Sequence, residues 1–173
     1  MNWNNQPQYN NLPTINGIGE HEGKEFTAKD VVNTTNAKED KLAMDIAGTY
    51  PPEAGVVSWK RTNTLLKEKE EVKVEDDYVL NKKPSTLQQT FMTVAKVDVS
   101  RKGKVVFVGD KEKLVLSFDE AVFTVTTENP TMVGAEYGKL MRHWDNRVIT
   151  RVLLTANNPQ TKGKLIYSFK KGE

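Results

Sequence analysis

Residues 9–19 read Y-N-N-L-P-T-I-N-G-I-G. Pro13 fixes its own φ and restricts Leu12 to extended geometry, which favours a short strand at this point. The pair Asn16-Gly17 is suited to positive φ and predicts a tight turn after the strand. The stretch therefore predicts a polar entry, a short strand and a turn that together open a β-domain.

The next segments of the chain alternate apolar and polar residues. This period of two is weak over residues 25–32 and clear over 41–47 and 72–78, and it is typical of half-buried strands. Residues 56–66 form a β-branched and aromatic run, and the charged residues 67–70 predict a turn. The runs 56–66 and 72–78 are therefore expected to form a hairpin.

Three consecutive residues of the run 56–66 have different expected environments. Trp59 is expected to point into the core, Lys60 to point to solvent, and Arg61 to bridge the next strand. A second interpretation takes Lys60 and Arg61 as cations that a strand presents to an acidic glycan.

Strand patterns continue to the end of the chain. Residues 86–94 and 96–100 are expected to supply another strand pair, and later strands are predicted at 105–108, 114–118, 121–127, 148–155 and 165–169. The pattern lapses over 128–145, where residues 141–144 are too short to predict a helix. We therefore expect an all-β fold, an antiparallel, supersandwich-like β-sandwich of about ten to twelve strands with little helix.

The expected domain organisation is simple. Residues 9–173 are interpreted as a single β-sandwich domain, a length that can bury a core without disulfides. Residues 1–8, M-N-W-N-N-Q-P-Q, are polar and aperiodic, and they are expected to form an N-terminal arm or an edge strand.

The composition argues against several classes of protein. The chain has 173 residues, no cysteine and a formal net charge of +2, so it carries no disulfide framework and no overall basic charge of the kind that nucleic-acid binding needs. No apolar run approaches the roughly 18 residues of a membrane span. Residues 1–20 are polar, so we expect no signal peptide in this chain.

Residue types that support catalysis are sparse. His21 and His143 lie far apart in the sequence, and neither belongs to a cluster with metal-ligand spacing, so no metal site and no cofactor are expected. The charge runs 67–71 and 75–77 are interpreted as solvated turn and strand residues. The sequence contains no nucleophile elbow, P-loop or dinucleotide fingerprint.

The opening stretch, taken together with the segments after it, resembles the C-terminal part of the heparinase II/III family of polysaccharide lyases. The resemblance is strongest over residues 8–80 and looser afterwards, and the final strands near 147–154 and 163–169 look like the last strands of the family. The segments that carry it are Q-Y and N-L-P-T-I-N-G at 8–17, G-K-E-F-T-A-K-D-V at 23–31, L-A-M-D-I-A-G-T-Y-P at 42–51, A-G-V at 54–56 and S-W-K-R-T at 58–62.

This resemblance implies a two-part enzyme, a helical toroid followed by a large antiparallel β-sandwich, that cleaves acidic glycans by β-elimination. A base removes the C5 proton of a uronic acid, and neutralisation of the carboxylate stabilises the intermediate. The tyrosine and histidines of the family lie upstream of the part that this chain resembles, so no catalytic residue is expected here. Family resemblance also implies a periplasmic or secreted protein.

One position departs from the family pattern. Asn10 stands where the family commonly has a histidine that binds a structural metal in some members. An amide oxygen is a poor zinc ligand compared with imidazole, so the departure also predicts that the chain holds no zinc.

Three functions remain as hypotheses. The leading one is a non-catalytic C-terminal sandwich module of a heparinase II/III-like lyase, which serves as a scaffold or as one wall of a glycan cleft. The second is a stand-alone module that binds acidic carbohydrate. The third is a lyase whose N-terminal part is missing. Substrate-binding candidates are Tyr9, Asn10, Asn11, Arg142, His143 and Trp144, with Trp3 as a further aromatic residue.

The expected partners depend on the same hypotheses. An acidic polysaccharide is the expected ligand, and neither nucleic acid nor a membrane is an expected partner. A sandwich without its upstream strands would expose sheet edges, so self-association or docking to an N-terminal toroid domain is also expected.

Overall fold

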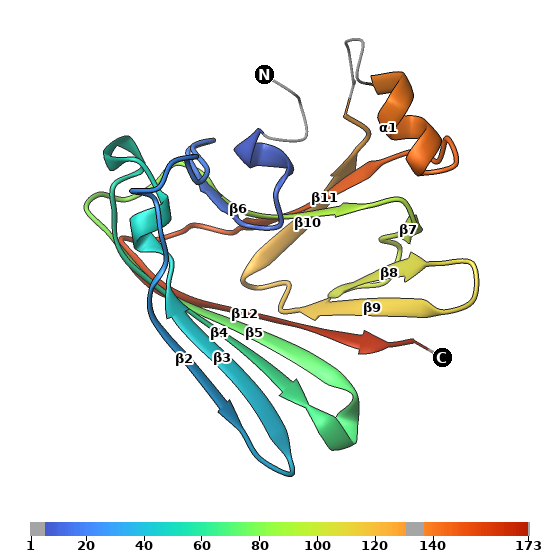
Figure 1. Cartoon of the computed structure of the whole chain (residues 1–173), viewed down its shortest axis with the longest axis horizontal. Helices are drawn as coiled ribbons and strands as arrows, with labels where there is room; N and C mark the ends of the chain where they lie inside the picture. Colours follow the sequence, from blue (N-terminus) through green and yellow to red (C-terminus); the bar gives the residue numbers. More distant parts are fainter. Residues whose placement is uncertain (1–5, 131–136, 173) are drawn as a thin grey trace.

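The computed structural model describes residues 6–130 and 137–172. Its strands form a four-stranded sheet in the order β1-β6-β11-β10 and an eight-stranded sheet in the order β2-β3-β4-β5-β12-β9-β8-β7. Neighbouring strands are antiparallel throughout both sheets. The two sheets are layered, with the larger sheet extending well past the smaller one (Figure 1). The expected all-β antiparallel sandwich is confirmed.

The smaller sheet contains β1 (Pro13–Ile15), β6 (Leu87–Thr93), β10 (Phe123–Glu128) and β11 (Thr150–Ala156). The larger sheet contains β2 (Lys29–Thr35), β3 (Glu39–Asp45), β4 (Val56–Leu66), β5 (Glu71–Leu80), β7 (Lys96–Asp98), β8 (Lys104–Val108), β9 (Lys113–Phe118) and β12 (Lys162–Lys171). The helical segments are the 3-10 turns η2 (Pro7–Tyr9), η3 (Ala47–Thr49), η4 (Pro52–Ala54) and η5 (Lys67–Lys69), and the α-helix α1 (Tyr137–His143).

The opening stretch forms the strand and turn that its residues predict. β1 pairs with β6, and it ends in a turn where Asn16 and Gly17 have φ values of 53° and 79°. The Asn16 side chain also accepts hydrogen bonds from the backbone of Ser85 and Thr86, at 2.8 and 3.1 Å. The turn is therefore tied to the loop that leads into β6, which fixes the position of β1 at the edge of the smaller sheet.

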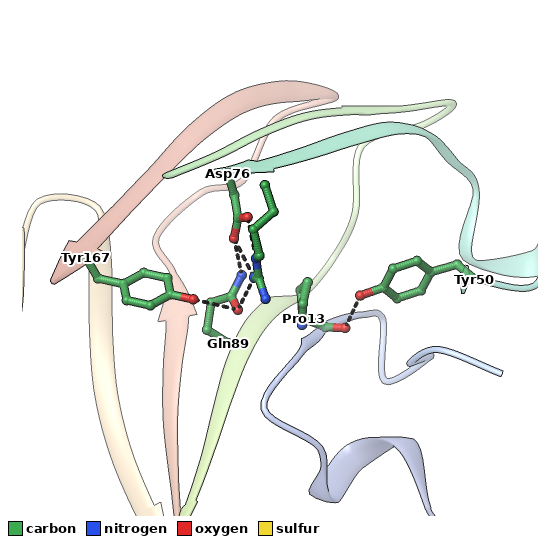
Figure 2. Close-up of polar contacts among 6 residues, drawn as sticks. Pro13, Tyr50, Asp76, Gln89 and Tyr167 are labelled. Carbon is green, nitrogen blue, oxygen red and sulfur yellow. Dashed lines mark hydrogen bonds and ion pairs between the residues drawn. The ribbon is translucent and has the colours of Figure 1, made fainter. Parts of the chain in front are cut away.

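An aromatic stack fills one part of the core. Trp59 on β4 is completely buried, and its ring stacks on Tyr78 with centroids 5.1 Å apart and on Tyr50 at 6.4 Å. The Tyr50 hydroxyl donates a 2.8 Å hydrogen bond to the carbonyl oxygen of Pro13 on β1 (Figure 2). The stack thus joins the larger sheet to the first strand of the smaller one.

A buried polar network makes a second link between the sheets (Figure 2). Arg61 on β4 donates two hydrogen bonds to Asp76 on β5, both 2.7 Å long. Gln89, on β6 of the smaller sheet, accepts a 3.0 Å hydrogen bond from Arg61 and donates one of 3.0 Å to Asp76. Tyr167 on β12 donates to the Gln89 side-chain oxygen at 3.5 Å.

Burial changes the ionisation of these groups. Removal from water alone would lower the pKa of Arg61, but the hydrogen bonds to Asp76 outweigh it, so the pKa of Arg61 lies above its ordinary value. Burial raises the pKa of the Tyr50 and Tyr167 hydroxyls, because the phenolate would have to form away from water. At neutral pH the network therefore contains a paired arginine cation and neutral tyrosines.

The predicted hairpin and its orientations are confirmed. β4 and β5 pair over Val56–Leu66 and Glu71–Leu80. Trp59 is buried, Lys60 is exposed, and Arg61 reaches the next strand through Asp76. The interpretation of Arg61 as a cation available to a glycan is wrong, because the guanidinium is buried in an ion pair.

Two strand predictions need correction. Residues 86–94 and 96–100 do not pair, because β6 belongs to the smaller sheet and β7 to the larger one. The chain bends between them, where the backbone N–H of Ala95 donates a 3.0 Å hydrogen bond to the Thr93 hydroxyl. The weak pattern at 25–32 begins with a turn, closed by a hydrogen bond from Phe26 N to Gly23 O, and β2 starts only at Lys29.

The segment that showed no strand pattern contains a short helix. α1 covers Tyr137–His143, with Arg142 and His143 in its last turn, where cations interact favourably with the helix dipole. Asp145 and Asn146 have φ values of 50° and 53°, and the Asn146 N–H bonds to the Met141 carbonyl, so the helix ends in a left-handed turn.

Replacing Arg61 with methionine tests the network. R61M leaves the fully buried Asp76 carboxylate without its cation, and we expect the free energy of unfolding to fall by about 3–5 kcal/mol in urea denaturation. K164M, which breaks the exposed Lys164–Asp77 pair at 3.4 Å, is the control and should cost less than about 1 kcal/mol. Equal costs for the two variants would contradict a central role for the buried pair.

The raised pKa of Tyr167 predicts a loss of stability in alkali. An unfolded tyrosine loses its proton above its ordinary pKa of 10.0, whereas the buried Tyr167 keeps it, so unfolding becomes more favourable as pH rises. Between about pH 9 and pH 11, Y167F should lose roughly 1.4 kcal/mol less of its free energy of unfolding than wild type. Parallel stability curves for the two proteins would show that Tyr167 ionises as readily in the folded state.

Candidate functional site

A pocket of about 690 Å³ opens between the two sheets at the β7–β8 edge. We call it the interlayer pocket and define it by Lys96, Val108, Asp110, Asn129, Arg147 and Val148. These residues come from the start of β7, the end of β8 with the turn after it, the segment just after β10 and the approach to β11. Four connections that are distant in the sequence therefore meet at one end of the sandwich.

The charged groups of the interlayer pocket are incompletely paired. Arg147 donates a 2.7 Å hydrogen bond from Nη2 to Asp110 and lies 4.0 Å from Asp145. Lys96 is exposed and has no acidic partner among the residues that the structure describes. Lys96, Arg147 and the Asp110 carboxylate thus line the pocket, and Asp145 lies beside Arg147, so the two cations face two carboxylates and Lys96 is the cation without a close acidic partner among the described residues.

Asn129 supplies a neutral polar group to the same pocket. Its amide nitrogen donates hydrogen bonds of 3.1 Å to the Ile149 carbonyl and to the Thr150 hydroxyl. Both bonds use the nitrogen, so the side-chain oxygen keeps its capacity to accept a hydrogen bond. Asn129 is therefore oriented by β11 and presents an acceptor.

The segment of η2 and residues 10–11, which carries the candidates Tyr9, Asn10 and Asn11, lies over the smaller sheet on the side away from the larger sheet (Figure 1). The Asn11 side-chain oxygen accepts a 2.9 Å hydrogen bond from the backbone of Met92 on β6. Asn10 donates a hydrogen bond from its amide to Glu20. Each amide uses one end in these contacts, so the side-chain oxygen of Asn10 and the side-chain nitrogen of Asn11 keep their hydrogen-bonding capacity.

Tyr9 has a cationic neighbour that the sequence did not reveal. The Arg151 guanidinium lies over the Tyr9 ring, 5.8 Å from its centroid, and pairs with Glu128 at 3.0 Å. Arg151 is on β11 and its register partner Met92 is on β6, so the strand pairing places it near the N-terminal turn. An aromatic ring beside an arginine is an arrangement that can hold a sugar acid.

The candidates Arg142, His143 and Trp144 lie next to one another at the end of α1. Arg142 and His143 are exposed, and Trp144 is half-buried. Figure 1 shows α1 on the same side of the smaller sheet as η2. The role of this group, and of Tyr9, Asn10 and Asn11, in substrate binding stays a prediction, and Trp3 lies outside the described residues.

The two histidines and the acidic residues are the side chains of this chain that could serve as metal ligands. His21 contacts the Phe26 ring at a centroid distance of 4.7 Å and lies in the loop after β1, remote in sequence from α1 with His143. Across residues 6–130 and 137–172, no three or more histidine, aspartate or glutamate side chains gather as a metal ligand group. No helix in the same ranges is long and apolar enough to cross a membrane.

Sequence reasoning missed the residues of the interlayer pocket. Lys96, Asp110, Asn129 and Arg147 are spread over 52 positions and form no local motif. Their one shared signal is position, since each lies at or just beyond the end of a predicted strand. Such positions identify loops, but only the sheet order shows which loops meet.

Comparison with family models and with curated proteins gives no match. Heparan sulfate lyase HepC from Pedobacter heparinus matches with a TM-score of 0.70 at 12% identity, over 99% of this chain and 25% of that chain. A structure of heparinase III matches with a TM-score of 0.67 at 12% identity, over 98% of this chain and 25% of the other. The chain spans about a quarter of the length of these lyases, and the resemblance seen in the sequence is confirmed at the level of the fold.

Proposed function

We propose that this chain is the C-terminal β-sandwich module of a heparinase II/III-like polysaccharide lyase, with no catalytic activity of its own. The observation that carries the proposal is the fold likeness to heparan sulfate lyase HepC over 99% of the chain, with a TM-score of 0.70. In this role the module acts as a scaffold or forms one wall of a glycan cleft.

Three buried ionisable side chains are unavailable for proton transfer to a substrate. Proton abstraction needs a group within hydrogen-bond reach of the substrate. Asp76 is fully buried and paired with Arg61, and Tyr50 and Tyr167 are buried with raised pKa values. These groups cannot reach a polysaccharide from inside the core.

An uncovered part of the larger sheet supports the scaffold role. Leu42, Leu65 and Val72 lie on β3, β4 and β5 on the same face as Arg61, as their register shows. They are 37–39% exposed, and Figure 1 shows that β3, β4 and β5 extend past the smaller sheet. An apolar sheet face of this kind is suited to packing against a further protein layer.

The second candidate is a stand-alone module that binds acidic carbohydrate. The specific observation in its favour is Tyr9 beneath the Arg151 guanidinium on the outer side of the smaller sheet. Under this proposal Tyr9, Asn10 and Asn11, with Arg142, His143 and Trp144, contact the glycan.

A lyase assay tests the proposal. The chain is incubated with heparin, heparan sulfate and alginate, and unsaturated product is followed by its absorbance. We expect no product from the chain alone, because it spans only about a quarter of the length of heparan sulfate lyase HepC. Heparan sulfate lyase HepC from Pedobacter heparinus serves as the positive control on heparan sulfate, and sustained turnover by the chain would overturn the non-catalytic assignment.

A further inference from the structure

We propose that the interlayer pocket binds the anionic group of an acidic sugar, with Arg147 and Lys96 holding a carboxylate or sulfate. The inference rests on the proposed function only for the choice of a glycan as ligand. It concerns a surface separate from Tyr9, Asn10 and Asn11, and it assigns Lys96, Asp110, Asn129 and Arg147 a role that their sequence positions do not suggest.

Arg147 is available to an incoming anion. Its contacts with Asp110 and Asp145 both use Nη2, and the two carboxylate side chains are 72% and 82% exposed. Exposed ion pairs of this type are weak, so Asp110 can turn to solvent when a ligand anion takes its place. The planar guanidinium then presents a fork that matches a carboxylate or sulfate group.

Lys96 adds a second positive charge from the opposite sheet. It begins β7 in the larger sheet, whereas Arg147 precedes β11 in the smaller sheet. An anion between the layers would therefore interact with both cations. This arrangement favours a single compact anionic group, because the two charges belong to one pocket and do not extend into a stripe along the surface.

The remaining lining suits the body of a sugar. Val108 and Val148 border the pocket, and Val148 is 66% exposed, so an apolar surface is available to the C–H groups of a pyranose ring. The side-chain oxygen of Asn129 can accept a hydrogen bond from a hydroxyl. The volume of about 690 Å³ falls within the range of small-molecule sites.

The test titrates the whole chain with glucuronate, with glucose 6-sulfate and with neutral glucose, and follows backbone amide shifts by NMR. Either anionic sugar should shift amides near Lys96, Asp110 and Arg147, whereas glucose should not. R147Q should weaken binding at least about tenfold through loss of a charge-assisted contact, and K96Q about two- to fivefold.

Asp110 gives a prediction of opposite sign. D110N removes the nearer of the two carboxylates that compete for Arg147, so anion binding should tighten by about two- to fivefold. K164Q removes one positive charge, as R147Q and K96Q do, and D77N removes one negative charge, as D110N does. Both control positions lie on the outer face of the larger sheet, so these variants should leave affinity within about twofold. Thermal denaturation of each variant verifies that the fold is intact.

The outcomes separate this proposal from the lyase proposal. No shift at millimolar anionic sugar, or equal effects of pocket and control variants, overturns the interlayer site and leaves the non-catalytic assignment standing. Turnover in the lyase assay overturns that assignment and leaves the pocket result standing. Tight binding that is lost in R147Q and strengthened in D110N supports the site.

Discussion

The ion pair between Arg61 and Asp76 is the constraint on which the packing of this sandwich depends. Both side chains are buried, so each charge relies on the other in place of water. Gln89 completes the pair from the smaller sheet, and it uses its amide oxygen and nitrogen to do so. A one-residue shift of β6 would turn Gln89 outward, so the network fixes the register of that strand as well as the distance between the sheets.

This central constraint leaves the ends of the strands free to vary. The interlayer pocket consists of turn and strand-end residues such as Asp110 and Arg147, which lie outside the buried network. Substitutions there change charge and surface without disturbing the core, and functional residues are commonly found on such loops. A fold shared at 12% identity with heparan sulfate lyase HepC is compatible with a different set of loop residues, so the chemistry has to be argued from this chain's own pocket.

Local patterns were sufficient to predict most of the sandwich. The alternation around Trp59, Lys60 and Arg61 predicted the correct faces, because a strand has one buried side and one solvated side. The assignment of 86–94 and 96–100 to one pair failed because the bend at Ala95 sends the chain to the other sheet, and neither run encodes the identity of its partner strand. The pocket could not be predicted for the same reason, since Lys96 and Arg147 meet only through the sheet order.

That order also separates the two surfaces with proposed roles. The apolar face of Leu42, Leu65 and Val72 lies on β3, β4 and β5, whereas Lys96 and Val108 belong to β7 and β8 at the opposite edge of the same sheet. A protein layer packed on the first surface would leave the second open, with the central strands β12 and β9 between them. The apolar surface is suited to a permanent contact and the charged pocket to an exchangeable ligand, so scaffold and ligand-binding roles can coexist in one rigid module.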